Sequence, residues 1–281
     1  MRGIDVSNYT GELSQVVLAS WRDEHDVGLV IAQSLNPPAG YPPGVTRQQV
    51  QAVTDAGLAC DIYLWLWTGS NVEQDMRNKL AVVNGQEHLI RKVWLDVEDT
   101  STSSPGQRIN AVRQAYAVID GWTQTHGKPP AGLYSALWYW PSYMDNTPEF
   151  SGRQLWDADY DGIEDAAASW RPYGGWSERA IKQYAGTSTL SGQGGIDLNV
   201  LSEAEAASIV TPPLPVPEPA PGGCEDQGWQ DKKWAVVQAA GELQALLDML
   251  EMEANRGPGP RKTAVRKLAA EMRARVETIL A

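Results

Sequence analysis

The chain has 281 residues, which is enough for one large domain and one small one. Its formal net charge is −12, and almost all of this acidic excess lies in residues 1–210. Because nucleic-acid binding requires clustered cations, this charge argues against a nucleic-acid partner, and also against attachment to anionic membranes or polymers by charge alone. The 12 Trp and 10 Tyr, against one Phe, suit surfaces that contact both apolar faces and hydroxyl groups, although such rings can equally fill a core.

Eight short runs of apolar, β-branched or aromatic residues predict strands. In chain order they are residues 3–6, 27–33, 58–65, 92–98, 131–135, 153–159, 179–184 and 195–198. Helical patterns separate most of the earlier runs, at residues 46–56 with Thr46 as a candidate N-cap, 71–84, and 105–126 with Pro105 in the first turn. The alternation predicts an α/β fold with a mostly parallel sheet: a small (β/α) barrel, similar to a TIM barrel, with some helices missing, over residues 1–210.

The remainder of the chain has a different composition. Residues 211–228 are rich in Pro and Gly and predict an extended linker. Residues 229–281 carry two amphipathic stripes separated by the breaking segment 256–260, which predicts an α-helical hairpin. A hairpin of this size hardly forms a core of its own, so we expect its apolar stripes to dock on the barrel, on a second copy or on a partner.

Two cysteines are too few for a disulfide framework and have no zinc-site spacing. Cys60 lies in an apolar run and is expected to be a buried free thiol, whereas Cys224 lies in the Gly/Pro-rich segment. The first residues enter a strand directly, so we expect no signal peptide and no membrane span.

Four carboxylates are expected at one mouth of the barrel: Asp5, Asp96, Glu98 and Asp197. Each falls at or near the end of a predicted strand, and the carboxyl ends of barrel strands converge on one face. Asp96 and Glu98 are two residues apart, so their side chains share a direction. The first and last strands close the barrel, which makes Asp5 and Asp197 neighbours.

Clustered carboxylates raise one another's pKa, which allows one of them to act as a general acid near neutral pH. Glycoside cleavage uses such acids in pairs. Two other interpretations remain open: each Asp alone can be a helix cap or turn former, and four carboxylates can bind a divalent metal ion. A metal-dependent hydrolase would lack a His ligand, because His25, His88 and His126 all fall in helical or loop stretches, so we expect no metal. We also expect no cofactor.

At these residues the chain resembles the glycoside hydrolase family 25 lysozymes, the Chalaropsis-type muramidases common in bacteriophages. The resemblance covers about residues 1–205 and leaves out the linker and the hairpin. Its motifs, in chain order, are GIDVSNY at 3–9, WLDVE at 94–98, GLYS at 132–135, LWDADY at 155–160, and QY at 183–184 followed by GIDLN at 195–199.

The resemblance implies a peptidoglycan hydrolase that cleaves the β-1,4 bond between N-acetylmuramic acid and N-acetylglucosamine. Glu98 would be the general acid/base, and Asp5, Asp96 and Asp197 would complete the acidic floor, with Asp96 orienting the acetamido group of the substrate. Whether the nucleophile is that acetamido group or a carboxylate stays open. The substrate-binding residues implied are Tyr9, Tyr63, Tyr134, Trp156, Tyr160 and Gln183.

Two departures from the family pattern are expected to touch the substrate groove. The family has Tyr-His-Phe where this chain has Tyr63, Leu64 and Trp65. It has Ala-Thr-Glu-Gly where residues 32–35 are Ala-Gln-Ser-Leu, followed here by a Pro/Gly-rich loop at 36–44. These changes motivate an alternative, a glycan-binding or tail-structural protein that keeps the barrel without catalysis.

The resemblance also indicates a route to the substrate. A phage endolysin or virion-associated lysin without a signal peptide would be made in the cytoplasm. It would act on the cell wall after holin-dependent lysis or as part of a virion. Peptidoglycan is the expected partner, and the C-terminal helices would serve self-association or contact with a virion.

Overall fold

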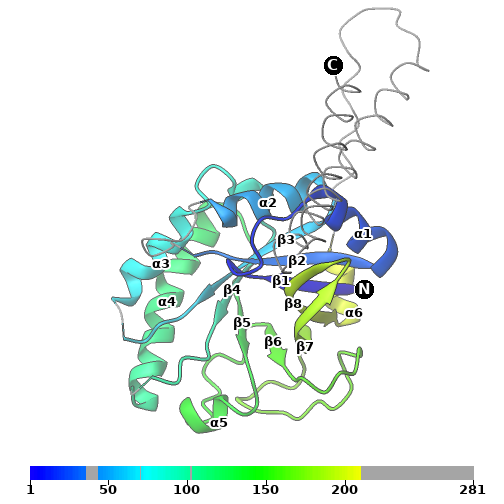
Figure 1. Cartoon of the computed structure of the whole chain (residues 1–281). Helices are drawn as coiled ribbons and strands as arrows, with labels where there is room; N and C mark the ends of the chain where they lie inside the picture. Colours follow the sequence, from blue (N-terminus) through cyan, green and yellow to red (C-terminus); the bar gives the residue numbers. More distant parts are fainter. Residues whose placement is uncertain (36–43, 70, 102, 210–281) are drawn as a thin grey trace, which may run out of the picture. The chain divides into compact units, whose positions relative to one another are not determined.

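A computed structural model describes residues 1–35, 44–69, 71–101 and 103–209, and eight strands of this part close into one barrel in chain order (Figure 1). The strands are β1 (Arg2–Val6), β2 (Val27–Gln33), β3 (Ala59–Trp65), β4 (Val93–Asp96), β5 (Gly132–Ser135), β6 (Leu155–Ala158), β7 (Ile181–Leu190) and β8 (Gln193–Leu201). The predicted small barrel is confirmed. The linker and hairpin predicted at 211–228 and 229–281, and Cys224, lie outside the described residues.

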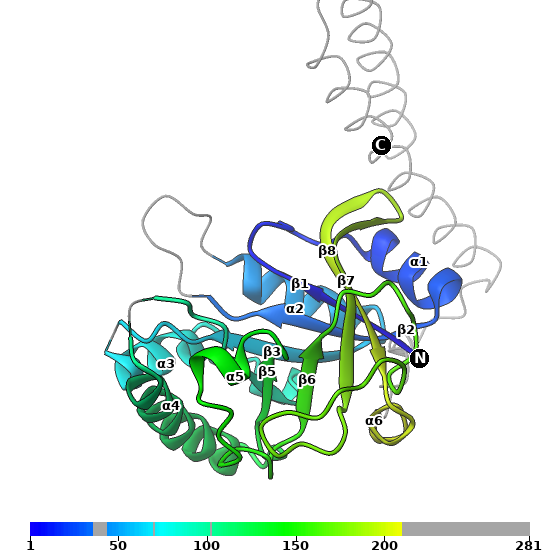
Figure 2. The ribbon, with the colours of Figure 1, turned by 90° about the horizontal axis from the view of Figure 1, so that it is seen from below.

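Helices are concentrated in the first half of the barrel, as the sequence predicted. They are α1 (Gln15–His25), α2 (Val45–Asp55), α3 (Val72–Ala81), α4 (Pro105–Thr125), α5 (Trp140–Tyr143) and α6 (Glu203–Ser208), with a 3-10 turn at Glu87–Leu89. Figures 1 and 2 show α1 to α4 flanking the early strands, while long loops accompany β6 and β7. None of the helices in the described part of the chain combines the length and apolar character needed to cross a membrane.

The direction of β8 differs from the expected parallel arrangement. Neighbouring strands from β1 to β7 are parallel, but β8 runs antiparallel to both β7 and β1. The connection between β7 and β8 is only Ser191 and Gly192, both with positive φ. A two-residue turn of this kind joins antiparallel strands, whereas a parallel crossover needs a dozen or more residues. Asp197 therefore reaches the barrel mouth from within β8 and not from the end of a strand.

The helix starts show one prediction confirmed and one wrong. Ser104 and Gln107 form a capping box before α4, with Pro105 in its first turn, as expected. Thr46 is not an N-cap, because α2 begins one residue earlier and is preceded by Gly44. The buried Thr46 hydroxyl instead donates to the carbonyl of Gln33 at 2.8 Å, which fixes α2 against the end of β2.

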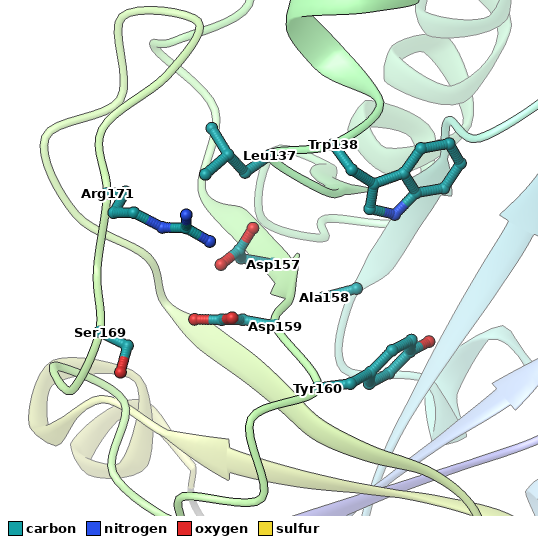
Figure 3. A pocket seen from close by; sticks show the side chains of 8 residues that line it. All are labelled: Leu137, Trp138, Asp157, Ala158, Asp159, Tyr160, Ser169 and Arg171. Atoms are coloured by element: carbon teal, nitrogen blue, oxygen red, sulfur yellow. The ribbon is translucent and has the colours of Figure 1, made fainter.

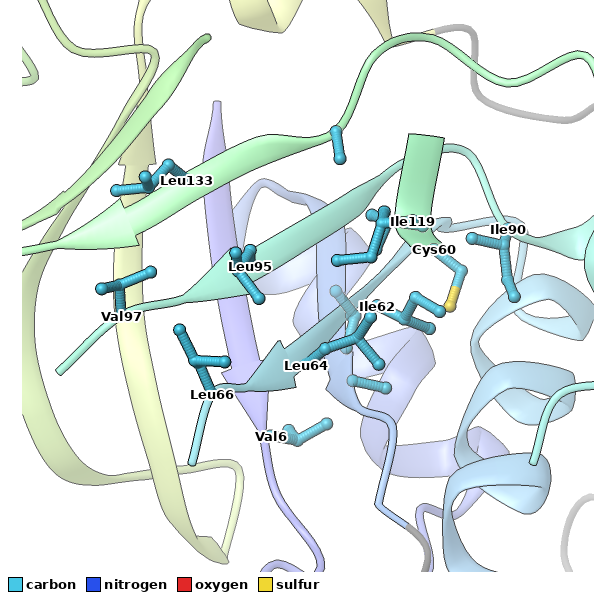
Figure 4. Packing of buried hydrophobic residues seen from close by; sticks show 14 of the residues in the cluster. Val6, Cys60, Ile62, Leu64, Leu66, Ile90, Leu95, Val97, Ile119 and Leu133 are labelled. Carbon is cyan, nitrogen blue, oxygen red and sulfur yellow. The ribbon is translucent and has the colours of Figure 1, made fainter. Parts of the chain in front are cut away.

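Alternation along the strands separates two apolar layers. Residues facing the helices form a continuous core, shown for β3 and β4 in Figure 4, which includes Leu64, Leu95, Val97 and the buried free thiol of Cys60. The thiol is the one expected from the sequence. The Leu64 side chain is fully buried in this outer layer.

Aromatic side chains fill the barrel interior. The ring centroids of Trp94 and Trp156 lie 5.9 Å apart, and those of Tyr134 and Trp156 lie 4.6 Å apart. Gly132 makes room for this layer, because a Cβ there would collide with the Trp94 ring. Asp96 is the next inward-facing residue after Trp94 on β4, so the acidic mouth lies directly beyond an apolar floor.

Candidate active site

The structure brings the four predicted carboxylates together at the mouth of the barrel. Asp5 comes from β1, Asp96 from the end of β4, Glu98 from two residues beyond it and Asp197 from β8. Burial raises the pKa of each, and neighbouring acids in the same group raise the pKa of Asp5, Asp96 and Glu98 further. Such a cluster favours protonated carboxyl groups near neutral pH.

One amide organises half of the cluster. Nε2 of Gln183 donates to Oδ2 of Asp5 at 2.8 Å and to Oδ2 of Asp197 at 3.0 Å. Nδ2 of Asn199 also donates to Oδ2 of Asp5 at 2.8 Å, and the backbone N–H of Thr187 donates to Oδ1 of Asp197 at 2.6 Å. Burial and the charge of Asp197 outweigh these bonds and raise the pKa of Asp5 to about 7.

Asp96 carries an unsatisfied oxygen. Its side chain is buried, and Oδ1 has no hydrogen-bond partner. Burial, followed by the charges of Glu98 and Asp5, raises its pKa well above the usual value. Because buried polar atoms are nearly always hydrogen-bonded, this oxygen is suited to accept a bond from a bound ligand.

Glu98 and Asp197 are the two partly exposed acids of the group, whereas Asp5 and Asp96 are buried. Glu98 differs from Asp197 in that no hydrogen bond joins its carboxyl group to another described residue. Burial and the charge of Asp197 raise its pKa. The adjacent backbone is held firmly, since the Val97 carbonyl accepts from the Ser135 hydroxyl at 2.9 Å and the Asp99 carbonyl accepts from the Tyr139 hydroxyl at 3.0 Å. The Glu98 carboxyl group thus makes no hydrogen bond to a described residue, while the backbone beside it is held in place.

Three tyrosines surround the acids. The Tyr63 ring packs edge-on against Trp156 with centroids 6.0 Å apart, and all four acids contribute to raising the pKa of its hydroxyl, after burial. The hydroxyl groups of Tyr134 and Tyr160 both donate to Oε1 of Gln183, at 2.7 and 2.9 Å. The structure therefore places these three tyrosines around the acids.

Gln183 and Trp156 differ from open groove residues. Each is 2% exposed. Gln183 links two tyrosines to two acids, and Trp156 lies in the interior floor with its Nε1 donating to Oδ1 of Asn199 at 2.8 Å. Both support the site from beneath, because alternation along β6 and β7 turns them into the barrel. Tyr9, by contrast, is 82% exposed in the loop after β1.

Three functional candidates were missed by sequence reasoning. Asn199 lies in the GIDLN motif, two residues after Asp197, and strand alternation could have identified it as a partner of Asp5. Trp67 and Trp138 are half-exposed and follow the ends of β3 and β5. Their position after strands that end at the mouth was the available signal.

The departure from the family at Leu64 does not touch the groove. The Leu64 side chain faces the helices, while its neighbours Tyr63 and Trp65 alternate toward the opposite side. The expectation that the loss of the family's His at Leu64 alters the groove is therefore wrong. The loop at 36–43 lies outside the described residues. Within the ranges that are described, no three His, Cys, Asp or Glu side chains are arranged to hold a metal ion.

The chain is similar in sequence to a known family and to several of its proteins. The family model "Glycosyl hydrolases family 25" matches residues 4–193. "Probable GH family 25 lysozyme 3" of Dictyostelium discoideum is 27% identical over 207 residues, covering 70% of this chain and 40% of that protein. "Probable GH family 25 lysozyme 5" of the same organism is 30% identical over 107 residues, covering 38% of this chain and 48% of that protein. The chain thus spans less than half the length of these two relatives.

Solved structures show the same fold at low sequence identity. The muramidase from Acremonium alcalophilum aligns with a TM-score of 0.56 at 17% identity, over 72% of this chain and 93% of that one. The bacterial lysozyme from Streptomyces coelicolor aligns with a TM-score of 0.56 at 14% identity, over 74% and 94%. Because the family model matches well over half of its residues, this chain belongs to the glycosyl hydrolases of family 25.

Proposed function

We propose that the barrel is a muramidase, which hydrolyses the β-1,4 bond between N-acetylmuramic acid and N-acetylglucosamine in peptidoglycan. The observation that carries the proposal is the pairing of Glu98, an accessible acid with no hydrogen bond to a described residue, with the buried and unpartnered Oδ1 of Asp96. The names of the relatives, lysozymes and muramidases, support the same substrate class.

The raised pKa of Glu98 fits the first step. A protonated Glu98 donates its proton to the glycosidic oxygen as the bond to the anomeric carbon breaks. The resulting carboxylate then removes a proton from the incoming water, whose oxygen bonds to the anomeric carbon. Glu98 ends protonated again, so one water is consumed and one glycosidic bond is lost.

Asp96 has a distinct role in this scheme. Its unpartnered Oδ1 accepts a hydrogen bond from the acetamido N–H of the cleaved sugar, which directs the amide oxygen toward the anomeric carbon. The alternative is that a carboxylate of the cluster attacks that carbon itself. In their ionised forms, Asp5 and Asp197 supply negative potential beneath the positive charge that develops on the sugar.

The reducing end of the products tests the assignment. Purified peptidoglycan is digested, the soluble products are reduced with borohydride, and the reduced sugar is identified by mass spectrometry. Reduced N-acetylmuramic acid is the expected result, and reduced N-acetylglucosamine would contradict it. Tight binding of the glycan with no new reducing end would instead favour the glycan-binding alternative.

Delivery from a phage is a separate part of the proposal. The motif resemblance to phage-type muramidases supports a role as an endolysin or a virion-associated lysin that is made in the cytoplasm. Under this proposal, residues 229–281 provide self-association or contact with a virion. Immunolabelling of purified virions with an antibody against residues 1–210 distinguishes the two routes. Labelled particles indicate a virion component, and unlabelled particles that arise from lysing cells indicate an endolysin.

A further inference from the structure

The exposed aromatic side chains of the described residues gather at one end of the barrel. Tyr9, Trp67, Trp138 and Tyr160 are each at least half-exposed, and each follows the carboxyl end of a strand, β1, β3, β5 or β6. Two of them, Trp138 and Tyr160, border a pocket of about 330 Å³ (Figure 3). The described Trp and Tyr residues outside this rim are buried or half-buried, so the exposure of these rings is specific to the mouth.

Tyr160 joins this pocket to the acid cluster. Its ring lines the pocket, while its hydroxyl donates to Oε1 of Gln183 at 2.9 Å. Gln183 in turn binds Asp5 and Asp197 through Nε2. The pocket and the acids therefore lie on opposite sides of one tyrosine side chain, which places the pocket next to the site of bond cleavage on the β5–β6 side.

The floor of the pocket is a fixed ion network. Nη1 of the buried Arg179 donates to Oδ2 of Asp157 at 2.6 Å and to Oδ2 of Asp159 at 3.0 Å. The Tyr173 hydroxyl donates to Oδ1 of Asp157 at 2.7 Å, so both oxygens of Asp157 are occupied. Oδ1 of Asp159 accepts no hydrogen bond from a described residue, and it remains an acceptor for a ligand.

A cation faces this floor. Figure 3 shows Arg171 pointing across the pocket toward Asp157, with Trp138 and Tyr160 on the far side. Arg171 is exposed, and no hydrogen bond or ion pair joins it to another described residue. The pocket therefore offers two aromatic rings, one free carboxylate oxygen and one free guanidinium group.

This combination fits a sugar better than a purely ionic or purely apolar ligand. Aromatic rings cover the C–H faces of a pyranose, a carboxylate oxygen accepts from its hydroxyl groups, and a guanidinium donates to its oxygens. Asp157 and Asp159 disfavour a ligand that carries only negative charge, and Arg171 disfavours one that is only apolar. We propose that this pocket binds a further pyranose unit of the glycan strand, beyond the sugar whose bond is cleaved.

The inference rests on the proposed function, and chain length is the variable that tests it. The probes are peptide-free glycan strands of defined length, from the shortest strand that the wild type cleaves to strands several sugars longer. Trp138→Ala should lower kcat/KM for the longer strands about tenfold and change it much less for the shortest strand. Arg171→Ala should show the same length dependence with a smaller loss. An equal loss at all lengths, or no loss, would overturn the proposal.

Matched controls and a binding measurement separate this inference from the assigned activity. Val16→Ala and Arg113→Ala remove exposed side chains on α1 and α4, away from the pocket, and should be neutral at every length. Binding of the same strands to Glu98→Gln, with and without Trp138→Ala, reports the pocket without cleavage. If the wild type cleaves no strand, the muramidase proposal fails, but a length-dependent loss of binding still supports the pocket.

Discussion

Asp5 and Asp197 lie directly opposite each other in the antiparallel pairing of β1 with β8, and Nε2 of Gln183 donates to both carboxyl groups. Two carboxylates that face each other across a pair of strands repel. A shared hydrogen-bond donor, or a proton on one of them, reduces this repulsion. Gln183 is the donor that the two carboxyl groups share, while Asn199 and Thr187 each bind only one of them.

Gln183→Leu should lower kcat by about tenfold to a hundredfold. The leucine fills similar space but removes the donor to both acids and the acceptor of two tyrosine hydroxyl groups. Because the bond from Gln183 lowers the pKa of Asp5, its loss should raise that pKa further and move the pH–rate profile toward higher pH. Gln51→Leu, on the surface of α2, is the control. An unchanged profile would remove Gln183 from this role.

The folded state should prefer a neutral Asp5. Burial and Asp197 raise its pKa to about 7, above the ordinary value of 3.8, so its contribution to stability is full below about pH 4 and is lost as the pH rises through about 7. Asp5→Asn, which is neutral at every pH, should raise the free energy of unfolding by about 1–3 kcal/mol at pH 8 and change it little at pH 4.

Urea unfolding at the two pH values measures this difference. Asp145→Asn, a change at an exposed acid, serves as the control because it alters charge without burial. If Asp5→Asn changes stability equally at both pH values, Asp5 does not titrate with the raised pKa.

Arg108 should act as a positioning residue for Glu98. It is buried, and its guanidinium donates to the carbonyl oxygens of Asp99, Ser101 and Ser103, the segment that directly follows Glu98. Arg108→Met should lower kcat about tenfold or more with a smaller effect on KM, because the carboxyl group loses its fixed position rather than its chemistry. Arg108→Lys should restore part of the activity. A parallel loss of secondary structure in both variants would point to a purely structural role.

Gly132→Ala should destabilise the barrel by about 1–3 kcal/mol or more, because the added methyl group meets the buried Trp94 ring in the interior floor. Gly121→Ala is the matched control. It lies within α4 with open space around the new methyl group, and it should be neutral or stabilising by up to about 1 kcal/mol. Thermal unfolding compares the two, and equal stabilities would contradict the packing described for the floor.

Sequence patterns predicted the architecture of the barrel more completely than the details of the site. Strand periodicity gave eight strands, and the ends of those strands gave Asp5, Asp96 and Glu98 at the mouth. The antiparallel course of β8 was missed because a strand pattern has no direction; only the two-residue turn at Ser191 and Gly192 determines it. Asn199 was within reach of the same reasoning, because it lies two residues after Asp197 and therefore faces the same side of β8.

The direction in which side chains face was the other feature that the sequence did not predict. The resemblance placed Trp156 and Gln183 in the groove, but whether a residue lies in an open groove or beneath it depends on the packing of neighbouring strands. Trp138 and Arg171 line the same pocket although they belong to separate loops, and no local sequence pattern links them. The long-range geometry of a barrel therefore has to be seen before such residues can be combined.

The central claim is that Glu98 is the acid that breaks the glycosidic bond, and Glu98→Gln tests it most directly. Soluble muropeptides released from purified peptidoglycan are quantified for the wild type, for Glu98→Gln and for the surface control Glu73→Gln, with folding checked by circular dichroism. We predict that the control matches the wild type and that Glu98→Gln releases products at least about a thousandfold more slowly while remaining folded. Release at the wild-type rate by Glu98→Gln would contradict the account.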